Sequence, residues 1–170
     1  MLIRDITPRD YEDVAALTVA AYERIAAPGE WGPGSPRGGL SDGYRKELLS
    51  VADRAMHAVV VVAEDEGRVV GAVTYVPGRG PYAEFSDPDA AGIRMLAVHP
   101  DAQGRGIGEA LIKECIERAR RERRTRIILH TTDWMRAAIR LYQRLGFRRS
   151  PGHDFSPAES ICLLSYTLDL

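Results

Sequence analysis

The apolar residues of this chain recur with two spacings, which predict helices in some segments and strands in others. Helical spacing predicts four helices, over 8–26, 41–55, 107–119 and 133–147. β-branched runs and alternation predict strands over 1–6, 58–63, 68–76, 92–98, 126–131 and 160–168.

Boundary signals support these elements. Thr7 precedes Pro8 as an N-cap followed by the first helical residue, and Gly146 is a helix C-terminal stop. Gly67 ends the turn of a hairpin between the second and third strands. The segments 28–40 and 77–91 are rich in glycine and proline and are predicted to be loops. Loops of this length are more often functional than idle.

The element order is β-α-α-β-β-β-α-β-α-β-β, which predicts a mixed α/β sheet with helices on both faces. The chain has no internal repeat or linker composition, so we expect residues 1–170 to form a single domain.

Composition excludes several classes of protein. The net charge is −1, so no general basic field favours nucleic acid, and we interpret the basic run 117–126 as a solvated helix end. The N-terminus is charged from Arg4 and no apolar run has the length of a membrane span. We therefore expect a cytoplasmic protein without nucleic-acid or membrane partners.

The two cysteines do not form a metal motif. Cys115 and Cys162 lie far apart, each within an apolar pattern, and neither belongs to a Cys-x-x-Cys or Cys/His cluster. We expect two reduced thiols in the core and no bound metal.

Closely spaced glycines join the strand 92–98 to the next helix, in the segment QGRGIG from Gln103 to Gly108. Backbone N–H groups at such a junction form a site for phosphate. A Walker A loop would need Lys-Ser/Thr after the last glycine, and a dinucleotide fingerprint would need glycine at Glu109. The pattern that remains is Q-x-x-G-x-G, although a tight turn without a ligand would use the same glycines.

This pattern, after MLAVHP and before AAIRLYQRLGF, resembles the GCN5-related N-acetyltransferase (GNAT) superfamily. The resemblance implies a GNAT-like α/β (α+β) fold with a mixed, mostly antiparallel sheet of six to seven strands. It implies acetyl-CoA as co-substrate, with the pyrophosphate held mainly by main-chain N–H groups. The residues given this role are Gln103, Gly104, Arg105, Gly106, Gly108 and Glu109.

The preceding strand resembles the family's central strand, which separates from its neighbour at a bulge and pairs with the pantetheine arm. Leu96, Ala97 and Val98 take this role by resemblance, and an N–H group at Leu96 or Ala97 would donate to the thioester oxygen. The alternative is that Leu96 and Val98 are ordinary core residues.

Tyr142 matches the second hallmark of the family, A-x-x-L-Y-x-x-x-G-F. The resemblance makes it the general acid that assists the leaving thiolate, whereas its spacing alone is also typical of a packed aromatic. Family members often carry Asn seven positions before this tyrosine, and this chain has Met135 there.

An amine acceptor must lose a proton before it attacks, so the chain needs a base. We predict Glu84, which lies near Tyr82 and Phe85, with His130 and Asp133 as other candidates; a solvated loop carboxylate and a structural histidine are the alternatives. We assign His99 and Asp101 to a turn, and His153 and Asp154 to the acceptor pocket. Trp31 and Trp134 either line that pocket or pack in the core.

The sequence therefore predicts an enzyme that transfers acetyl directly from acetyl-CoA to a primary amine, on a small molecule or a peptide. The alternative is a non-catalytic acyl-CoA-binding or regulatory domain, which could dispense with Tyr142. The acceptor stays open among polyamines, amino acids, aminoglycosides and protein amines. Dimers are common in the family, so the resemblance allows a homodimer.

Overall fold

The computed structural model describes residues 1–26, 40–158 and 161–170. The predicted loop 28–40, with Trp31, lies outside the described residues except for Leu40. The described helices are α1 (Tyr11–Ala26), α2 (Asp42–Leu49), α3 (Val51–His57), α4 (Ile107–Arg121) and α5 (Arg136–Arg144). Short 3-10 turns cover Pro8–Asp10, Pro100–Ala102 and Pro151–His153.

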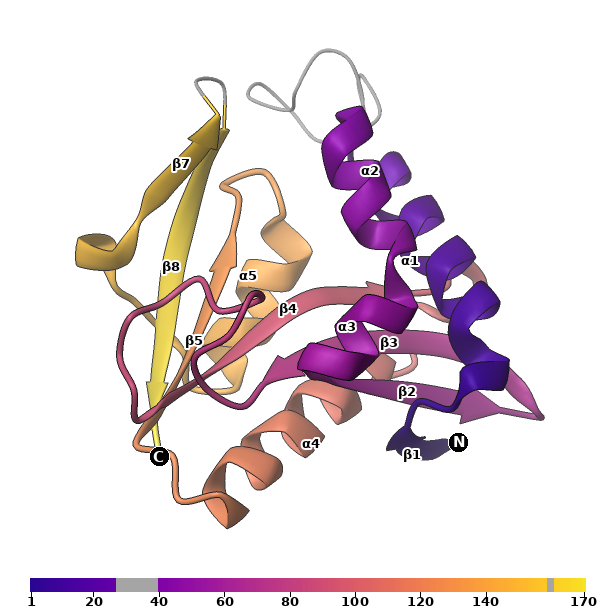
Figure 1. Cartoon of the computed structure of the whole chain (residues 1–170), viewed down its shortest axis with the longest axis horizontal. Coiled ribbons are helices and arrows are strands. Elements are labelled where there is room, and N and C mark those ends of the chain that lie inside the picture. The colour runs from indigo at the N-terminus through magenta and orange to yellow at the C-terminus, as the bar shows by residue number, and fades with distance from the viewer. Residues whose placement is uncertain (27–39, 159–160) are drawn as a thin grey trace.

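One mixed sheet in the described residues has eight strands, in the order β1-β2-β3-β4-β5-β8-β6 with β7 paired to β8 (Figure 1). The strands are β1 (Leu2–Asp5), β2 (Val59–Asp65), β3 (Arg68–Val76), β4 (Ala90–Val98), β5 (Arg126–Thr131), β6 (Arg148–Arg149), β7 (Phe155–Ala158) and β8 (Ile161–Asp169). Only the β4–β5 pair is parallel among these pairings. The predicted mostly antiparallel sheet is confirmed, and the short strands β6 and β7 raise the count above the expected six to seven.

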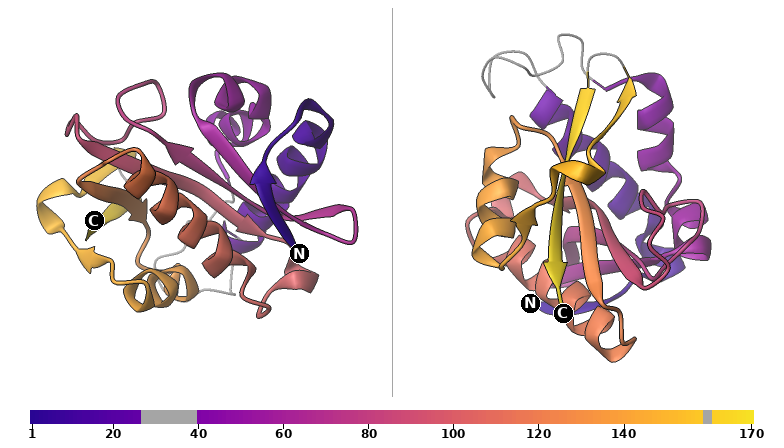
Figure 2. Two further views of the ribbon diagram at one scale, coloured as in Figure 1. Left: turned by 90° about the horizontal axis from the view of Figure 1, so that it is seen from below. Right: turned by 90° about the vertical axis from the view of Figure 1, so that its left-hand side faces the viewer.

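The helices lie on both faces of the sheet, as predicted (Figure 2). On one face α4 and α5 cover a core that includes Leu111, Ile127 and Tyr142. On the other face α1 and α3 cover a second core that includes Val14 and Val62. Neighbouring residues of β2 contribute alternately to the two cores, because successive side chains of a strand point to opposite faces.

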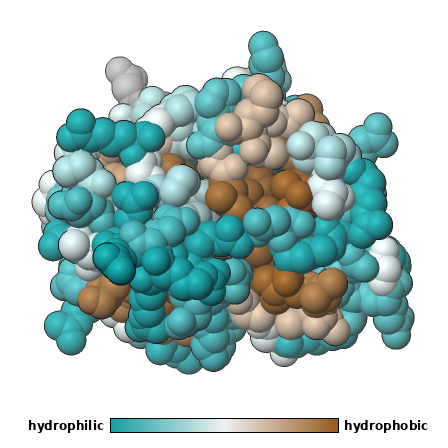
Figure 3. Space-filling view, turned by 60° about the horizontal axis from the view of Figure 1, so that its bottom comes forward, coloured by the Kyte–Doolittle hydropathy of each residue, from teal (hydrophilic) through white to brown (hydrophobic). Residues whose placement is uncertain are grey.

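The outer side of α4 carries charged residues that pair one helical turn apart. Lys113 Nζ lies 2.7 Å from Glu109 Oε1, and Arg118 Nη2 lies 3.4 Å from Glu114 Oε1. Such pairs suit a helix with one face in water. The face that carries α4 is accordingly a mosaic of hydrophilic residues with separate apolar areas (Figure 3).

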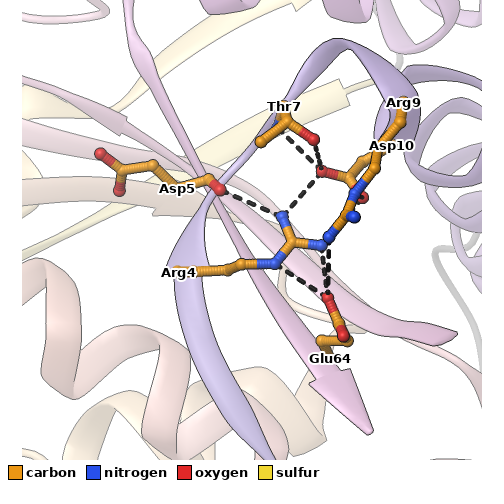
Figure 4. A network of polar contacts seen from close by, with 6 residues as sticks. All are labelled: Arg4, Asp5, Thr7, Arg9, Asp10 and Glu64. Atoms are coloured by element: carbon orange, nitrogen blue, oxygen red, sulfur yellow. Dashed lines mark hydrogen bonds and ion pairs between the residues drawn. The ribbon is translucent and has the colours of Figure 1, made fainter. Parts of the chain in front are cut away.

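Arg4 ties β1 to its neighbours at the edge of the sheet (Figure 4). Its guanidinium makes two bonds to the Asp10 carboxylate, at 2.7 and 2.9 Å, and contacts Glu64 Oε2 at 2.5 Å. Asp10 also accepts from the backbone N–H of Thr7 at 2.8 Å, and Thr7 is the N-cap residue at this helix start, as predicted. Arg4 holds the pKa of Asp10 well below its usual range.

Two expectations about local structure differ from the fold. The segment 41–55 forms two helices rather than one, because Ser50 leaves helical geometry at φ −79° and ψ 54°. Its hydroxyl donates to the Lys46 carbonyl at 2.8 Å, an alternative to continuing the helix. The helix predicted from residue 8 begins with a 3-10 turn before α1.

Candidate active site

The strands β4 and β5 separate at the centre of the molecule (Figure 1). They pair only from Ala90 to Ile93, against Arg126 to Leu129. Met95 has a left-handed φ of 53°, and the register against β3 shifts between Ala72 and Thr74. No strand of the described residues pairs with β4 on the β5 side beyond Ile93. The predicted bulge and separation are therefore confirmed, and one backbone edge of Leu96–Val98 has no strand partner there.

The glycine loop lies directly beyond this separated end. Gly104 and Gly106 have φ values of 74° and 79°, where a side chain is strained, and Gly106 is the N-cap of α4. A Cβ atom added at either glycine would meet nothing within 4 Å. The exposed loop and the free N–H groups of the first α4 turn can therefore receive an anion.

Side chains fix the loop from both ends. Gln103 Nε2 donates to the carbonyl of Val98 at 3.3 Å, which links the loop to β4. Arg105 Nη2 lies 2.5 Å from Asp65 Oδ2. Glu109 pairs with Lys113, which lowers the pKa of the Glu109 carboxyl. Its other oxygen, Oε2, lies 3.6 Å from Arg144 Nη2 on α5. Because both oxygens of the Glu109 carboxylate already face cations, the backbone rather than this side chain is free for a ligand.

Tyr142 lies on α5 at the same junction. A Cβ atom at Gly108 would lie 3.5 Å from Leu141, 3.7 Å from Val98 and 3.8 Å from Leu96, so α4, α5 and the separated end of β4 meet here. The Tyr142 side chain is buried in the α4-side core, and its ring centroid is 5.9 Å from that of Phe147. Burial raises the pKa of the Tyr142 phenol, which keeps it protonated at neutral pH.

Three polar side chains gather where the strands part. Arg94 follows the last β4 residue that pairs with β5, and its Nη2 atom is 2.7 Å from Glu84 Oε1. The other Glu84 oxygen, Oε2, is 3.4 Å from His130 Nδ1 on β5. The loop glutamate and the strand histidine, predicted as separate candidates, are thus neighbours.

Contacts on the side of the ring away from Glu84 fix the orientation of His130. Its Nε2 atom is 3.1 Å from the carbonyl oxygen of His153, and its ring packs edge-on against Phe155 with centroids 4.9 Å apart. A carbonyl only accepts, so Nε2 carries the proton in this contact. In neutral His130 the lone pair is therefore on Nδ1, which faces Glu84.

Further acidic and aromatic residues surround this group. Glu47 Oε1 lies 3.0 Å from Arg94 Nη2, and the Tyr82 ring lies 5.8 Å from the Arg94 guanidinium. The Tyr82 hydroxyl donates to Asp53 at 2.6 Å. Burial raises the pKa of Tyr82 to about 12, so this hydroxyl stays a neutral donor.

The other predicted residues lie outside this cluster or serve it indirectly. His99 and Asp101 form the predicted turn, where His99 Nδ1 accepts from the Asp101 N–H at 3.3 Å. Asp133 is exposed and Trp134 is buried. Asp154 pairs with Arg149 and accepts from the Ser165 N–H, while His153 contributes its carbonyl to His130.

The expectation for the cysteines is half correct. Cys115 is buried, and burial raises the pKa of its thiol to about 12. The prediction for Cys162 is wrong, since this residue is exposed. It lies near the start of β8, before the part that pairs with β5 from Leu164 onward, so the central core does not cover it. No group of three potential metal ligands occurs in the described ranges 1–26, 40–158 and 161–170.

Two residues of the site were missed in the sequence. Arg94 and Glu47 contact Glu84 or its partner, but neither belongs to a recognisable motif. The available signal was the one charged residue inside the strand pattern GIRMLAV, because an apolar central strand has little reason to carry a cation.

No helix in the part of the chain that the structure describes has the length and apolar character needed to cross a membrane. Two curated N-acetyltransferases, both uncharacterized, resemble the chain. A Schizosaccharomyces pombe protein is 28% identical over 106 residues, covering 62% of this chain and 61% of its own. YjgM of Escherichia coli is 33% identical over 108 residues, covering 64% of this chain and 61% of its own. The match thus covers less than two thirds of each relative.

Solved structures share the architecture over nearly the whole chain. A ribosomal-protein-alanine N-acetyltransferase of Brucella melitensis superposes with a TM-score of 0.69 at 27% identity, covering 100% of both chains. A Salmonella typhimurium structure that contains its cofactor acetyl-CoA gives a TM-score of 0.66 at 21% identity, covering 99% of this chain and 93% of that one. The family model for the acetyltransferase (GNAT) family matches residues 24–147. With its separated central strands and glycine loop, the chain belongs to the acetyltransferase (GNAT) family.

Proposed function

We propose that this protein transfers an acetyl group from acetyl-CoA directly to a primary amine. One observation carries the proposal: the separated end of β4 joins two chemically different groups. The anion-receiving glycine loop follows Val98, and the Arg94, Glu84 and His130 cluster lies at the other end. Donor and acceptor would therefore meet along Leu96–Val98.

The cofactor side is assigned to the loop and to the strand backbone. Acetyl-CoA supplies the acetyl group as a thioester. Gln103, Gly104, Arg105, Gly106, Gly108 and Glu109 would hold the pyrophosphate, mainly through N–H groups at the start of α4. The unpaired backbone edge of Leu96, Ala97 and Val98 would hydrogen-bond the pantetheine arm, with an N–H at Leu96 or Ala97 donating to the thioester oxygen.

The acceptor side would remove the proton that blocks attack. The Nδ1 lone pair of His130, beside the Glu84 carboxylate, takes a proton from the bound ammonium group. The amine nitrogen then forms the C–N bond as the C–S bond breaks, and the second proton that this nitrogen loses neutralises the departing thiolate, so that the products are the amide and the free CoA thiol. Positioning the two substrates together contributes several kcal/mol to lowering the barrier.

Tyr142 would serve the leaving group. Its raised pKa makes it a weak acid, and a thiol pKa of about 8.5 makes the thiolate a fair leaving group, so a hydrogen bond from the phenol is sufficient help. The buried Cys115 and the exposed Cys162 on β8 do not enter the reaction, which is consistent with direct transfer. We also infer that residues 1–170 act as one domain, since β1 to β8 share one sheet.

The test combines a binding measurement with a turnover measurement. Calorimetry gives the affinity for acetyl-CoA, and thiol release in the presence of a panel of amines gives the rate. We expect Tyr142→Phe and Glu84→Gln each to lower kcat by about 10- to 100-fold with the acetyl-CoA affinity nearly unchanged. Tyr11→Phe, at a tyrosine of α1 packed on the opposite core, is the matched control.

Two outcomes would change the assignment. Unchanged turnover in Tyr142→Phe would remove the proposed acid. Binding of acetyl-CoA without turnover of any amine would favour the acyl-CoA-binding domain. Met135, which stands at the usual Asn position, supports that alternative. In this chain the Thr131 hydroxyl contacts the Met135 sulfur at 3.5 Å.

A further inference from the structure

Arg94 places a positive charge within an otherwise acidic cluster. Its side chain is only 15% exposed, on the strand between the two halves of the site. A buried charge costs stability unless its partners compensate, and a central strand can be packed without one. The position therefore indicates a use other than support of the sheet.

The guanidinium retains donor capacity. Both carboxylates, Glu47 and Glu84, contact the same atom, Nη2. Nη1 makes one weak contact, at 3.5 Å to the carbonyl of Tyr82. Arginine has five N–H donors in a planar fork that matches a carboxylate with two parallel bonds. Arg94 can thus bind a further anion beside Glu84 by donating hydrogen bonds to it.

The charges at the site form an adjacent pair of opposite sign. Arg94 Nη2 and Glu84 Oε1 are 2.7 Å apart, and the nearly buried His130 ring adds a proton acceptor on the far side of Glu84. A free α-amino acid carries its ammonium and carboxylate on the same carbon, about one ion-pair distance apart. Laid head to tail on Arg94 and Glu84, it satisfies both groups at once.

We propose that the acceptor is a free amino acid, whose carboxylate is bound by Arg94 while its amine is held by Glu84 and His130. This inference rests on the proposed acetyl transfer and names its substrate class. A polyamine would bring a second cation close to Arg94, and a peptide amine has no carboxylate at this distance. Both classes are outcomes of the test.

The first experiment uses the unaltered protein and matched acceptors. Thiol release is measured with several amino acids, with their α-amides, and with the amines that lack the carboxyl group. We expect kcat/KM to be about 10- to 100-fold higher for the acid than for its amide, as for a charge-assisted bond. The amine of an amide is less basic and more often neutral, so its intrinsic reactivity opposes this preference.

The second experiment tests Arg94 itself. We expect Arg94→Gln to bring the acid-to-amide ratio of kcat/KM near one and Arg94→Lys to retain part of it. The affinity for acetyl-CoA should not change in either variant. Arg120→Gln, which removes an exposed guanidinium from the far end of α4, is the control and should keep the full ratio.

Two kinds of result would overturn the inference. One is equal turnover of acids and amides, or faster turnover of diamines or peptides, by the unaltered protein. Another is an acid preference that survives in Arg94→Gln. If Arg94→Gln does not fold and therefore does not bind acetyl-CoA, the acid-to-amide ratios of the unaltered protein and of Arg94→Lys decide whether the inference holds. Failure of every acceptor would instead overturn the proposed acetyl transfer, and this inference with it.

Discussion

Arg54 shows how a single residue supports the proposed acceptor side of the molecule. It is the largest fully buried side chain among the described residues. Its Nη1 atom contacts the Leu48 carbonyl at 3.1 Å and the Glu47 carbonyl at 3.3 Å. It also contacts the sulfur of Met95, the bulge residue of β4, at 3.0 Å. Burial lowers the pKa of Arg54, but the contacts to the end of α2 and to the bulge hold the side chain in place.

Removing this side chain should destabilise the fold. Arg54→Ala leaves buried carbonyls unsatisfied and opens a cavity, and we expect a loss of about 3 kcal/mol in the free energy of unfolding. Arg45→Ala, on the preceding helix α2, removes a half-exposed partner of Glu23 and should cost less than about 1 kcal/mol. Urea unfolding measures both; equal stability of the two variants would contradict the role of Arg54.

The Arg4–Asp10 pair predicts a dependence of stability on acid. The folded pKa of Asp10 lies below its unfolded value of about 3.9, so its contribution is present above that pH and is lost as pH falls toward the folded pKa. We expect the free energy of unfolding to fall by about 1 to 3 kcal/mol over this range from this group. Asp10→Asn should flatten the curve, whereas Asp13→Asn, at an exposed carboxylate three residues on, should leave it steep.

At the scale of the elements, α2 and α4 offer a matched comparison of glycines. Gly43 and Gly108 are each the second residue of a helix. A Cβ atom would meet nothing within 4 Å at Gly43, but it would enter the junction of Leu141, Val98 and Leu96 at Gly108. All those contacts are ordinary van der Waals distances, so neither alanine should disturb the fold.

Gly108→Ala should therefore separate binding from stability. We expect its free energy of unfolding to stay within about 1 kcal/mol of the unaltered protein, because alanine is the better helix former. Its affinity for acetyl-CoA should fall about 10-fold, the equivalent of one lost backbone contact. Gly43→Ala should keep full affinity. Calorimetry measures the affinity and urea unfolding measures the stability. Undiminished acetyl-CoA binding by Gly108→Ala would contradict a cofactor site at this junction.

Most elements were predictable because their signals are local. The turn at Gly67 and the stop at Gly146 have the left-handed φ values, 77° and 92°, that favour glycine. The interruption at Ser50 was not predicted, since it depends on one side-chain bond within an otherwise helical pattern. β7 was missed because DFSPAES has no apolar alternation and its pairing is supplied by β8.

At the scale of the whole molecule, the two sides of the site differ in how they are encoded. The glycine loop and the separated strand end occupy one continuous segment, 95–109, so a motif could identify them. The proposed acceptor cluster takes Glu47 from α2, Glu84 from a loop, Arg94 from β4 and His130 from β5. Only the assembled sheet brings them together, which is why Glu84 and His130 were predicted singly and Arg94 not at all.

Ligand binding should stabilise the whole fold by mass action. At acetyl-CoA concentrations about 100 times Kd, we expect about 2.7 kcal/mol of added stability. For a protein of this size that is a rise of about 5 to 10 °C in Tm, measured by thermal unfolding with and without acetyl-CoA. Gly108→Ala should show a smaller rise at the same concentration, and no rise in the unaltered protein would contradict cofactor binding.

The dispersed origin of the acceptor cluster also makes this scaffold divisible for engineering. Residues of α2 and of the loop between β3 and β4 touch Arg94 from outside the segment 95–109. For the proposed acceptor site, libraries confined to these two segments should therefore change the acceptor while the proposed cofactor loop stays intact. The same division lets a lineage of duplicated genes diversify its amine substrates without rebuilding its source of acetyl groups.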